Sequence, residues 1–369
     1  MRFLTADYLY PLNRDPIKEG VLQISSKGEI IDVYTDRNDF SQDSLEFFEG
    51  VLCPGFVNAH CHLELSHLQG EIDKGSGLVE FISGIKKRNC FSKDSILDAI
   101  MRAENQMVLN GIVGVGDICN TTDTIIQKKR GNLNYYNFIE AFGVKQNKTD
   151  QIITDIKFLK DQFIKNGLRA TITPHSPYSV PPRLMQDIKR NFTDEDELFS
   201  VHMQETSDEN ILFKNKSGKF FTWLTSNGGC TSIWDERNNS TDILKELDYR
   251  KVLLVHNTFA AKKDIKDQFY CTCPKANLFI ENTLPDYSIF KADKLCVGTD
   301  SLASNNSLSI LEELKIIQKN SNFDLNTLLK ISAKNGAEAL GFKDLGTFER
   351  GKKPGVNLIN ELSMVEIIA

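Results

Sequence analysis

The chain has 369 residues, of which 40% are hydrophobic and 25% charged, an ordinary composition for a soluble globular protein. Its net charge of −6 argues against a nucleic-acid partner, because affinity for the phosphate backbone depends on Lys and Arg. No apolar run approaches the roughly 18 residues of a membrane span, and the N-terminus lacks the apolar core of a signal peptide. The eight cysteines follow no disulfide spacing. We therefore expect a cytoplasmic protein with no membrane partner.

Both ends of the chain are rich in short β-like segments. The stretch 20–35, GVLQISSKGEIIDVYT, holds two alternating segments around a Ser-Ser-Lys-Gly turn, which predicts a hairpin. The stretch 345–368 joins a Gly-rich turn to another β-like run. We expect residues 1–50 and 346–369 to form one composite domain, a small β-sandwich built from both termini.

The middle of the chain, residues 51–345, alternates β-like runs with helical segments. Amphipathic spacing and a glycine or asparagine at the end predict helices over 94–110 and 149–167. Eight runs favour a (β/α)₈ TIM barrel, with a doubly wound open sheet as the structural rival. The runs are 55–63, 111–118, 135–143, 168–177, 198–206, 251–259, 277–283 and 294–301.

Histidines collect at one end of these predicted strands. Five of the six lie at or near the C-terminal end of a run, and Asp300 closes the eighth run in CVGTDS. In a barrel all these ends open onto one mouth, where active sites are found. The pattern therefore predicts one polar site made of side chains from several strands. The five histidines are His60, His62, His175, His202 and His256.

The H-x-H pair is the first indication of a metal site. His60 and His62 are two residues apart, so on a strand both side chains point the same way. Together with His202 and Asp300 they provide three imidazoles and one carboxylate. Such a set holds one divalent ion with a position left for water, as in catalytic zinc sites. We expect Zn²⁺, and Fe²⁺ suits the same ligands.

Two further residues are candidates for proton transfer. Glu205 follows His202 by three residues, just past the predicted strand end, and is the candidate general base. The alternative for Glu205 is a solvated carboxylate in a loop or in the first turn of a helix. His256 is the candidate proton donor or partner of the attacking water, or a further metal ligand. Glu140 on the third strand could bridge a second metal, although a buried acid paired with a neighbour is the preferred interpretation.

As an ordered set, the motifs PGFVNAHCH, VHMQET, LVHN and VGTDS resemble the amidohydrolase superfamily. The similarity is to its branch of cytosine, guanine and S-adenosylhomocysteine deaminases and triazine chlorohydrolases, and it covers essentially the whole chain. In that branch one metal is held by residues that correspond here to His60, His62, His202 and Asp300. The resemblance thus implies a hydrolase acting on C–N bonds, a small-molecule substrate and a divalent metal.

The same resemblance implies roles for three further residues. The residue matching Glu205 carries a proton from the metal-bound water to a ring nitrogen of the substrate. The residue matching His256 stabilises the water and the tetrahedral intermediate, and Asp300 belongs to the same catalytic group. TPHSPYSV is similar to the fourth-strand motif whose histidine contacts substrate, which here is His175.

Within the branch, HCHLELS and GTDSLASNNSLSILEEL look most like aminodeoxyfutalosine deaminases of the futalosine route to menaquinone. Two departures are Gln69, where many relatives carry arginine, and GKKPGVNLI near the C-terminus. The resemblance implies hydrolytic deamination of an adenine-type base with release of ammonia. The alternatives are another nucleoside or base, another leaving group such as chloride, and a non-catalytic scaffold on the same barrel.

A basic cluster offers a hypothesis about specificity. Lys86, Lys87 and Arg88 follow the first motif, where related nucleoside deaminases tend to carry an acid. One of the three is a candidate partner for a substrate carboxylate, while the alternative is a solvated helix face. The sequence assigns no role to His67. A homodimer is a reasonable expectation for a soluble enzyme.

Overall fold

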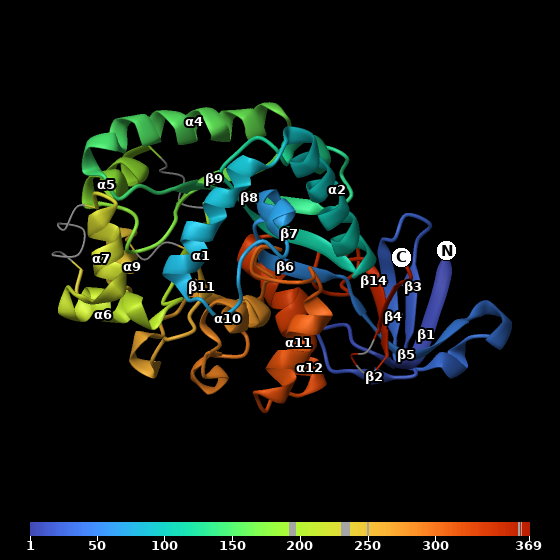
Figure 1. Cartoon of the computed structure of the whole chain (residues 1–369). Coiled ribbons are helices and arrows are strands. Elements are labelled where there is room, and N and C mark those ends of the chain that lie inside the picture. Colours follow the sequence, from blue (N-terminus) through green and yellow to red (C-terminus); the bar gives the residue numbers. More distant parts are fainter. Residues whose placement is uncertain (192–196, 230–236, 249–250, 361, 363) are drawn as a thin grey trace.

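The structure is a computed structural model that describes residues 1–191, 197–229, 237–248, 251–360, 362 and 364–369. Figure 1 shows two parts: strands surrounded by helices, and a β-rich layer that carries both chain ends. The two chain ends lie close together in that layer.

The terminal strands form one seven-stranded sheet in the order β15-β14-β5-β1-β3-β4, with β2 paired to β1. The expected hairpin is present as β3 and β4, and β14 joins the two chain ends by pairing with β5. β5 crosses the expected domain boundary at residue 50. Two-layer packing as a sandwich stays a prediction. The strands are β1 Arg2–Leu9, β2 Ile17–Lys18, β3 Val21–Ile24, β4 Ile30–Tyr34, β5 Glu46–Pro54, β14 Val356–Asn360 and β15 Met364–Ile367.

The middle of the chain builds two parallel four-stranded sheets, β6-β7-β8-β9 and β10-β11-β12-β13. Their strands are almost entirely buried on both faces, as expected for parallel sheets covered by helices. The fold is therefore mixed α/β. The strands are β6 Phe56–Cys61, β7 Ile112–Cys119, β8 Asn134–Ala141, β9 Ala170–Pro174, β10 Phe199–Met203, β11 Val252–His256, β12 Phe269–Thr272 and β13 Leu295–Val297.

Hydrogen bonds connect the two sheets at both of their edges. At one edge the amide of His202 donates to the carbonyl of His175 over 2.9 Å. At the other edge the amides of Thr299 and Asp300 donate to the carbonyl of His60 over 3.1 Å each. Asp300 also forms a parallel bridge with Cys61. Both edges thus meet at residues that the sequence analysis placed in the site.

The seventh predicted strand is wrong. Residues 277–283 belong mostly to helix α10, Pro274–Glu281, and the seventh strand is β12 at Phe269–Thr272. Pro274 occupies the first turn of α10, where its missing N–H costs nothing. Ala276, Asn277 and Ile280 then fall on one buried face at helical spacing. The apolar run NLFI had suggested a strand because short apolar runs fit both structures.

The two long predicted helices are confirmed as α2 and α4, the latter with Ile156, Leu159 and Phe163 buried on one face. No helix among the described residues is long and apolar enough to span a membrane. Besides α10, the helices are α1 Leu78–Gly84, α2 Lys93–Leu109, α3 Ile125–Lys128, α4 Thr149–Lys165, α5 Pro182–Asn191, α6 Ser207–Asn215, α7 Gly218–Ser226, α9 Asp242–Glu246, α11 Ile310–Lys319, α12 Leu325–Leu329 and α13 Asn335–Leu340.

Candidate active site

Four of the residues predicted as metal ligands lie together at the C-terminal ends of the parallel strands. Nε2 of His62 lies 3.1 Å from Nε2 of His60 and 3.2 Å from Nε2 of His202. Oδ1 of Asp300 lies 3.4 Å from Nε2 of His62 and 3.7 Å from Nε2 of His60. They come from β6, β10 and the segment after β13, so sequence-distant residues converge on one point.

The spacing and charge state of these groups fit a cation. Ligand atoms of a tetrahedral ion with bonds of 2.0–2.1 Å lie about 3.4 Å apart. The separations here, from 3.1 to 3.7 Å, lie on both sides of this value. Burial and the neighbouring histidines hold the pKa values of His60 and His202 well below their usual range. Both imidazoles are therefore neutral, with lone pairs free to bind a metal. The residues thus fit a divalent ion by distance and by donor type.

Two glycines let neighbouring strands approach the strand that carries His60. The ladder between β6 and β7 carries one extra residue on β6 between Asn58 and Cys61, a bulge next to His60. A Cβ on Gly116 would lie 2.4 Å from the carbonyl oxygen of Ala59. A Cβ on Gly298 would lie 2.6 Å from the carbonyl oxygen of His60. The backbone of the H-x-H segment is therefore packed from both sides.

A buried ion pair supports the same segment from behind. Oδ1 of Asp117 accepts from the amide of Leu63, which directly follows His62, over 2.8 Å. Oδ2 of Asp117 accepts from the ammonium of Lys128, which also donates to Oδ1 of Asn137 over 2.6 Å. Both charged side chains are fully buried. A buried charge of this kind is tolerated because its partner and hydrogen bonds replace water.

Glu205 and His256 face each other beside the histidine cluster. Oε1 of Glu205 lies 3.6 Å from Nε2 of His256. Burial raises the pKa of Glu205 to about 7, although His256 opposes that shift. Nδ1 of His256 donates to Oδ1 of Asn277 over 2.8 Å, so Nε2 is the nitrogen that faces Glu205. A carboxyl group with a pKa close to neutral is suited to take up and return a proton.

Asn277 is a site residue that the sequence analysis missed. The sequence predicts a strand over 277–283, whereas the structure forms a helix through most of this stretch. The helix α10 begins at Pro274 and carries Asn277 on its buried face. The proline at the first helical position was the available sign.

Strained backbone conformations also occur at the same end of the strands. Gln204, His256, Asn257 and Asp300 have positive φ angles of 47°, 70°, 52° and 56°. Such conformations cost non-glycine residues roughly 1–3 kcal/mol each and cluster at functional sites. These four residues lie at or just beyond the ends of β10, β11 and β13. These residues therefore lie at the same edge of the sheets as the histidine cluster.

His175 lies beside the ligand cluster, in the turn after β9. Its Nδ1 is 2.7 Å from Oγ of Ser179 and 3.0 Å from Oγ of Ser176. Burial lowers the pKa of His175, which keeps the imidazole neutral. Its ring centroid is 4.7 Å from that of His202. Both serines were already visible in the motif TPHSPYSV.

Glu140 pairs with neighbours, as the preferred interpretation of the sequence expected. Oε1 of Glu140 lies 3.4 Å from Nδ1 of His202, and Oε2 accepts from Nδ2 of Asn120 over 3.0 Å. A carboxylate behind a ligand histidine orients the ring and raises its basicity. Glu140, His175 and His202 also offer ligand atoms within 4.8 Å of one another.

The basic cluster is largely engaged by the chain itself. Nη1 of Arg88 lies 3.5 Å from Oε1 of the buried Glu64, and the ammonium of Lys87 donates to the carbonyl of Glu71. Lys86 is exposed. Arg88 is the most buried of the three, and its charge already has a partner. Contact between this cluster and a substrate carboxylate stays a prediction.

Two buried residues near Arg88 had no role in the sequence analysis. One carboxylate oxygen of Glu64 accepts from the amides of Asn120 and Thr121, which ties the first motif to the segment after β7. The ring of His67 packs 5.0 Å from that of Phe91, and burial lowers its pKa. Both residues follow the H-x-H pair by only a few positions.

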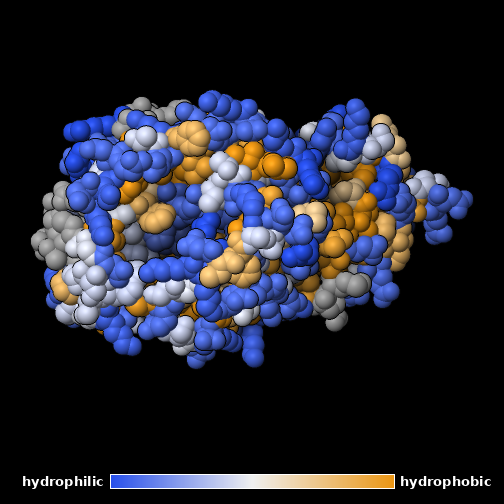
Figure 2. Space-filling model, turned by 45° about the horizontal axis from the view of Figure 1, so that its top comes forward, coloured by the Kyte–Doolittle hydropathy of each residue, from blue (hydrophilic) through white to orange (hydrophobic). Residues whose placement is uncertain are grey.

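A cluster of buried apolar side chains lies beside the histidine site, with the ring of Tyr178 5.8 Å from that of His175. Figure 2 shows a hollow in the molecular surface between the positions of α1 and α7. These two helices, α6, α10 and the turns after β6 and β9 contribute to one apolar cluster, with Leu78, Phe81, Tyr178, Phe220 and Leu224 among its members. Apolar side chains next to a polar site suit a small organic ligand.

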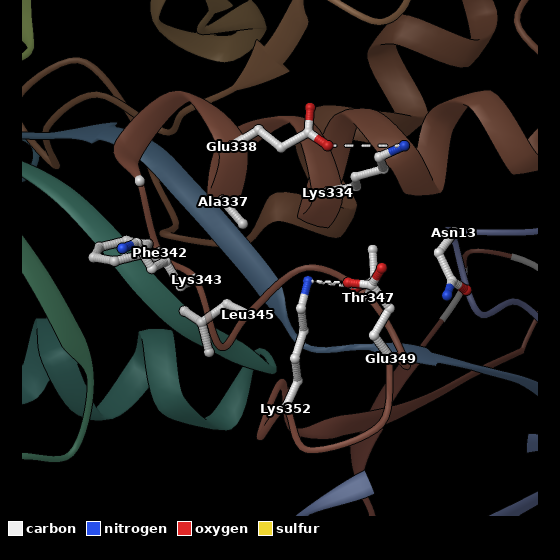
Figure 3. Close-up of a pocket in the computed structure, with 11 residues that line it drawn as sticks. Asn13, Lys334, Ala337, Glu338, Phe342, Lys343, Leu345, Thr347, Glu349 and Lys352 are labelled. Carbon is white, nitrogen blue, oxygen red and sulfur yellow. Dashed lines mark hydrogen bonds and ion pairs between the residues drawn. The ribbon is translucent and has the colours of Figure 1, made fainter. Parts of the chain in front are cut away.

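A second cavity lies elsewhere. It measures about 470 Å³ and is lined by Lys334 just before α13, Glu338 in α13 and residues of the following loop such as Phe342 (Figure 3). Phe342 and Leu345 of this lining pack against Gly114 near the start of β7. The cavity is therefore at the opposite end of the strands from the histidines.

Residues 51–366 match the amidohydrolase family. The chain belongs to this family, which confirms the resemblance drawn from its motifs. The match spans the parallel sheets, the histidine cluster and the C-terminal strands that return to the terminal sheet.

Curated relatives extend this result to named enzymes. The chain is 30% identical over 337 residues to an adenosine deaminase of Helicobacter pylori, covering 85% of this chain and 80% of the relative. It is 25% identical over 326 residues to an aminodeoxyfutalosine deaminase of Nitratiruptor sp., covering 84% and 79%.

Solved structures share the fold. The aminofutalosine deaminase of H. pylori in complex with methylthio-coformycin has a TM-score of 0.83 at 24% identity, covering 100% of this chain and 97% of that one. An adenosine deaminase from Xanthomonas campestris with bound zinc has a TM-score of 0.74 at 20% identity, covering 98% and 84%. At these identities the likeness shows the common architecture.

Proposed function

We propose that this protein is a metal-dependent hydrolytic deaminase of an adenine-type substrate. The observation that carries the proposal is the convergence of three imidazoles and Asp300 beside Glu205. Such a site activates water, and the named relatives act on adenine-type substrates. Hydrolysis replaces the exocyclic amino group of the base with oxygen and releases ammonia.

His60, His62, His202 and Asp300 are the proposed ligands of one divalent ion, with zinc expected from the imidazole-rich set. When bound, such an ion makes water a stronger acid and available for attack at neutral pH. Glu140 and the carbonyl of His175 both lie next to Nδ1 of His202. They would keep its Nε2 aimed at the ion.

Proton transfer is proposed for Glu205. As a carboxylate it takes a proton from the attacking water and delivers it to the ring nitrogen next to the carbon under attack. The burial that raises its pKa to about 7 makes both steps accessible near neutral pH. His256 presents Nε2 towards the same space because Asn277 engages Nδ1. It would hold the water and then the tetrahedral centre by hydrogen bonding.

His175 and the apolar cluster are proposed to bind the rest of the substrate. The side chain of His175 is held by two serine hydroxyls and lies next to His202. The apolar cluster beside it would cover a hydrophobic group on the sugar. Aminodeoxyfutalosine, whose sugar bears a benzoate, is the substrate that the motifs and one curated relative favour.

The finer architecture belongs to the same proposal. We infer that the two parallel sheets close into one (β/α)₈ barrel over residues 51–345, supported by the hydrogen bonds at both edges. Residues 1–50 and 346–369 would form a separate β-sandwich domain. The cytoplasmic location and the homodimer stay predictions.

The test is ammonia release from a panel of substrates. Aminodeoxyfutalosine, its uncharged phenyl analogue, adenosine, cytosine, guanine and a chlorinated triazine are compared at equal enzyme concentration. We expect kcat/KM to be highest for an adenine-type nucleoside. Chloride release without ammonia release, or ammonia from cytosine or guanine alone, would refute the proposal. A lower kcat/KM in Arg88→Ala for the charged analogue only would support the carboxylate contact.

A further inference from the structure

We propose that Arg237 is a positioning residue that clamps the turn 176–180 and thereby orients His175 and Tyr178 towards the substrate. Arg237 lies between β10 and β11 in the sequence, about 60 positions after the turn. None of the motifs or the proposed catalytic steps involves it. The effect on substrate rests on the proposed function, whereas the clamp itself does not.

The guanidinium of Arg237 is completely enclosed by its own chain. Its exposed fraction is 1%, and it is the bulkiest of the fully buried side chains in the described structure. Nε and Nη2 donate to the two carboxylate oxygens of Glu246 in α9, over 2.5 and 2.7 Å. A bidentate pair of this kind fixes the plane of the guanidinium. The direction in which the third nitrogen, Nη1, points is thereby fixed.

That direction is the turn after β9. Nη1 of Arg237 donates to the carbonyl of Pro177 and, over 3.0 Å, to the carbonyl of Val180. All five residues of the turn are buried, so these carbonyls depend on protein donors in place of water. One side chain therefore closes the two ends of the turn. Lysine could not do this, because it lacks the planar fork that binds carboxylate and carbonyls together.

The clamped turn carries groups that face the site. Ser176 and Ser179 hold Nδ1 of His175, and the amide of Gly143 donates to the carbonyl of Ser179 over 2.9 Å. The ring of Tyr178 lies 5.8 Å from that of His175 and 4.6 Å from that of Phe220 in α7. A shift of this turn would therefore move the side chains of His175 and Tyr178 at the site.

The clamp also connects two neighbouring loops. The ammonium of Lys216, at the end of α6, donates to the backbone carbonyl of Arg237. α6 begins at Ser207, shortly after Glu205, with Thr206 as its cap. Arg237 thus joins the loop that carries His175 to the helix that follows the proposed base. Figure 1 shows α5, α7 and α9 at this same end of the molecule.

The experiment compares Arg237→Met and Glu246→Gln with wild type, using Arg183→Met as the matched control. Arg183 pairs with Asp150, and both side chains are largely exposed, so the control removes an arginine ion pair without touching the turn. Glu246→Gln is the milder variant and carries the test if Arg237→Met does not fold. Hydrogen exchange of a peptide covering 176–180, metal content, KM and kcat are measured for each.

We expect exchange in 176–180 to accelerate on the order of tenfold relative to the control, with other regions unchanged. KM for the best substrate should rise by about tenfold or more, because small misplacements of binding groups are costly. Metal content and kcat should change little. A purely structural role would lower stability but leave KM of the folded enzyme unchanged.

Three results would overturn the inference. Exchange in 176–180 that matches the control would show that Arg237 does not hold the turn. Exchange that rises equally across the whole chain would show general destabilisation. Local acceleration with unchanged KM would remove the effect on substrate. If wild type deaminates none of the panel, the proposed function fails, and local exchange alone then decides whether the clamp exists.

Discussion

Glu205 is the residue on which the proposed chemistry depends most. It is 6% exposed, and its Oε1 lies 3.6 Å from Nε2 of His256. In Glu205→Gln the side chain keeps its size but cannot relay a proton. We expect kcat to fall about 10²–10⁴-fold, the usual contribution of a placed acid–base group, while metal content and KM change little. Steady-state kinetics with metal analysis would measure this.

Glu209→Gln is the control for this substitution. Glu209 is also a buried acid, four residues later, and it accepts from Oγ of Ser240 rather than facing the histidines. Its variant should retain wild-type kcat. A Glu205→Gln enzyme that turned over at the control rate would place the base elsewhere.

Gly298 shows how a residue without a side chain contributes to the site. An ideal Cβ there would lie 2.6 Å from the carbonyl oxygen and 2.8 Å from the amide nitrogen of His60. Gly298→Ala must therefore displace the strand that carries the first ligand. We expect metal affinity to drop about 10–100-fold, as for other groups that orient ligands. Dialysis against graded chelator, followed by metal analysis, would test this.

Gly131→Ala is the comparison for Gly298→Ala. Gly131 has a φ of 71° but no atom within 4 Å of its ideal Cβ, so alanine strains the backbone without touching the site. This variant should be less stable yet bind metal as wild type does. Equal metal retention in both variants would contradict the importance of close packing at His60.

At the scale of elements, α6 contains an acid that makes stability depend on pH. Burial raises the pKa of Glu209 from 4.5 to about 7. A raised pKa means that the folded state holds the proton more tightly than the unfolded state. The bound proton on Glu209 therefore stabilises the folded state. This stabilisation is complete below pH 4.5, is lost as the pH rises, and is gone above about pH 7. The difference between the folded and unfolded pKa of Glu209 corresponds to about 3 kcal/mol of unfolding free energy.

Glu209→Gln removes this titration while the amide oxygen can still accept from Ser240. The unfolding free energy of the variant, relative to wild type, should therefore rise by about 3 kcal/mol between pH 4.5 and pH 8. Reversible denaturant unfolding at several pH values would measure the difference. A difference that does not vary with pH would show that Glu209 has an ordinary pKa in the folded protein.

The elements that the sequence predicted well are those with a strong local pattern. α2 and α4 follow helical periodicity over 17 residues each, and β3 and β4 flank a turn-forming sequence. The prediction failed at 277–283, where three consecutive apolar residues fit a strand and a helix equally well. There the proline at position 274 and the packing of Asn277 against His256 decide for the helix. Packing of this kind is a tertiary effect that local pattern does not contain.

At the scale of the whole molecule, the distinction between local sequence pattern and tertiary packing also applies to the site. His60, His62, His202 and Asp300 lie together because parallel strands present their C-terminal ends at one edge, a regularity that sequence order reveals. The supporting groups follow no such regularity. Asn277 and Arg237 reach their partners from 21 and about 60 positions away, through contacts that depend on the finished fold.

We predict one catalytic metal per chain, although Glu140, His175 and His202 form a second grouping of donors. The most direct measurement is ammonia release from the best adenine-type substrate by metal-free protein as Zn²⁺ is added. The rate should rise in proportion to zinc and level off at one ion per chain, and His62→Ala should stay inactive over the same range. Full activity without metal, or a plateau only at two ions, would contradict the account.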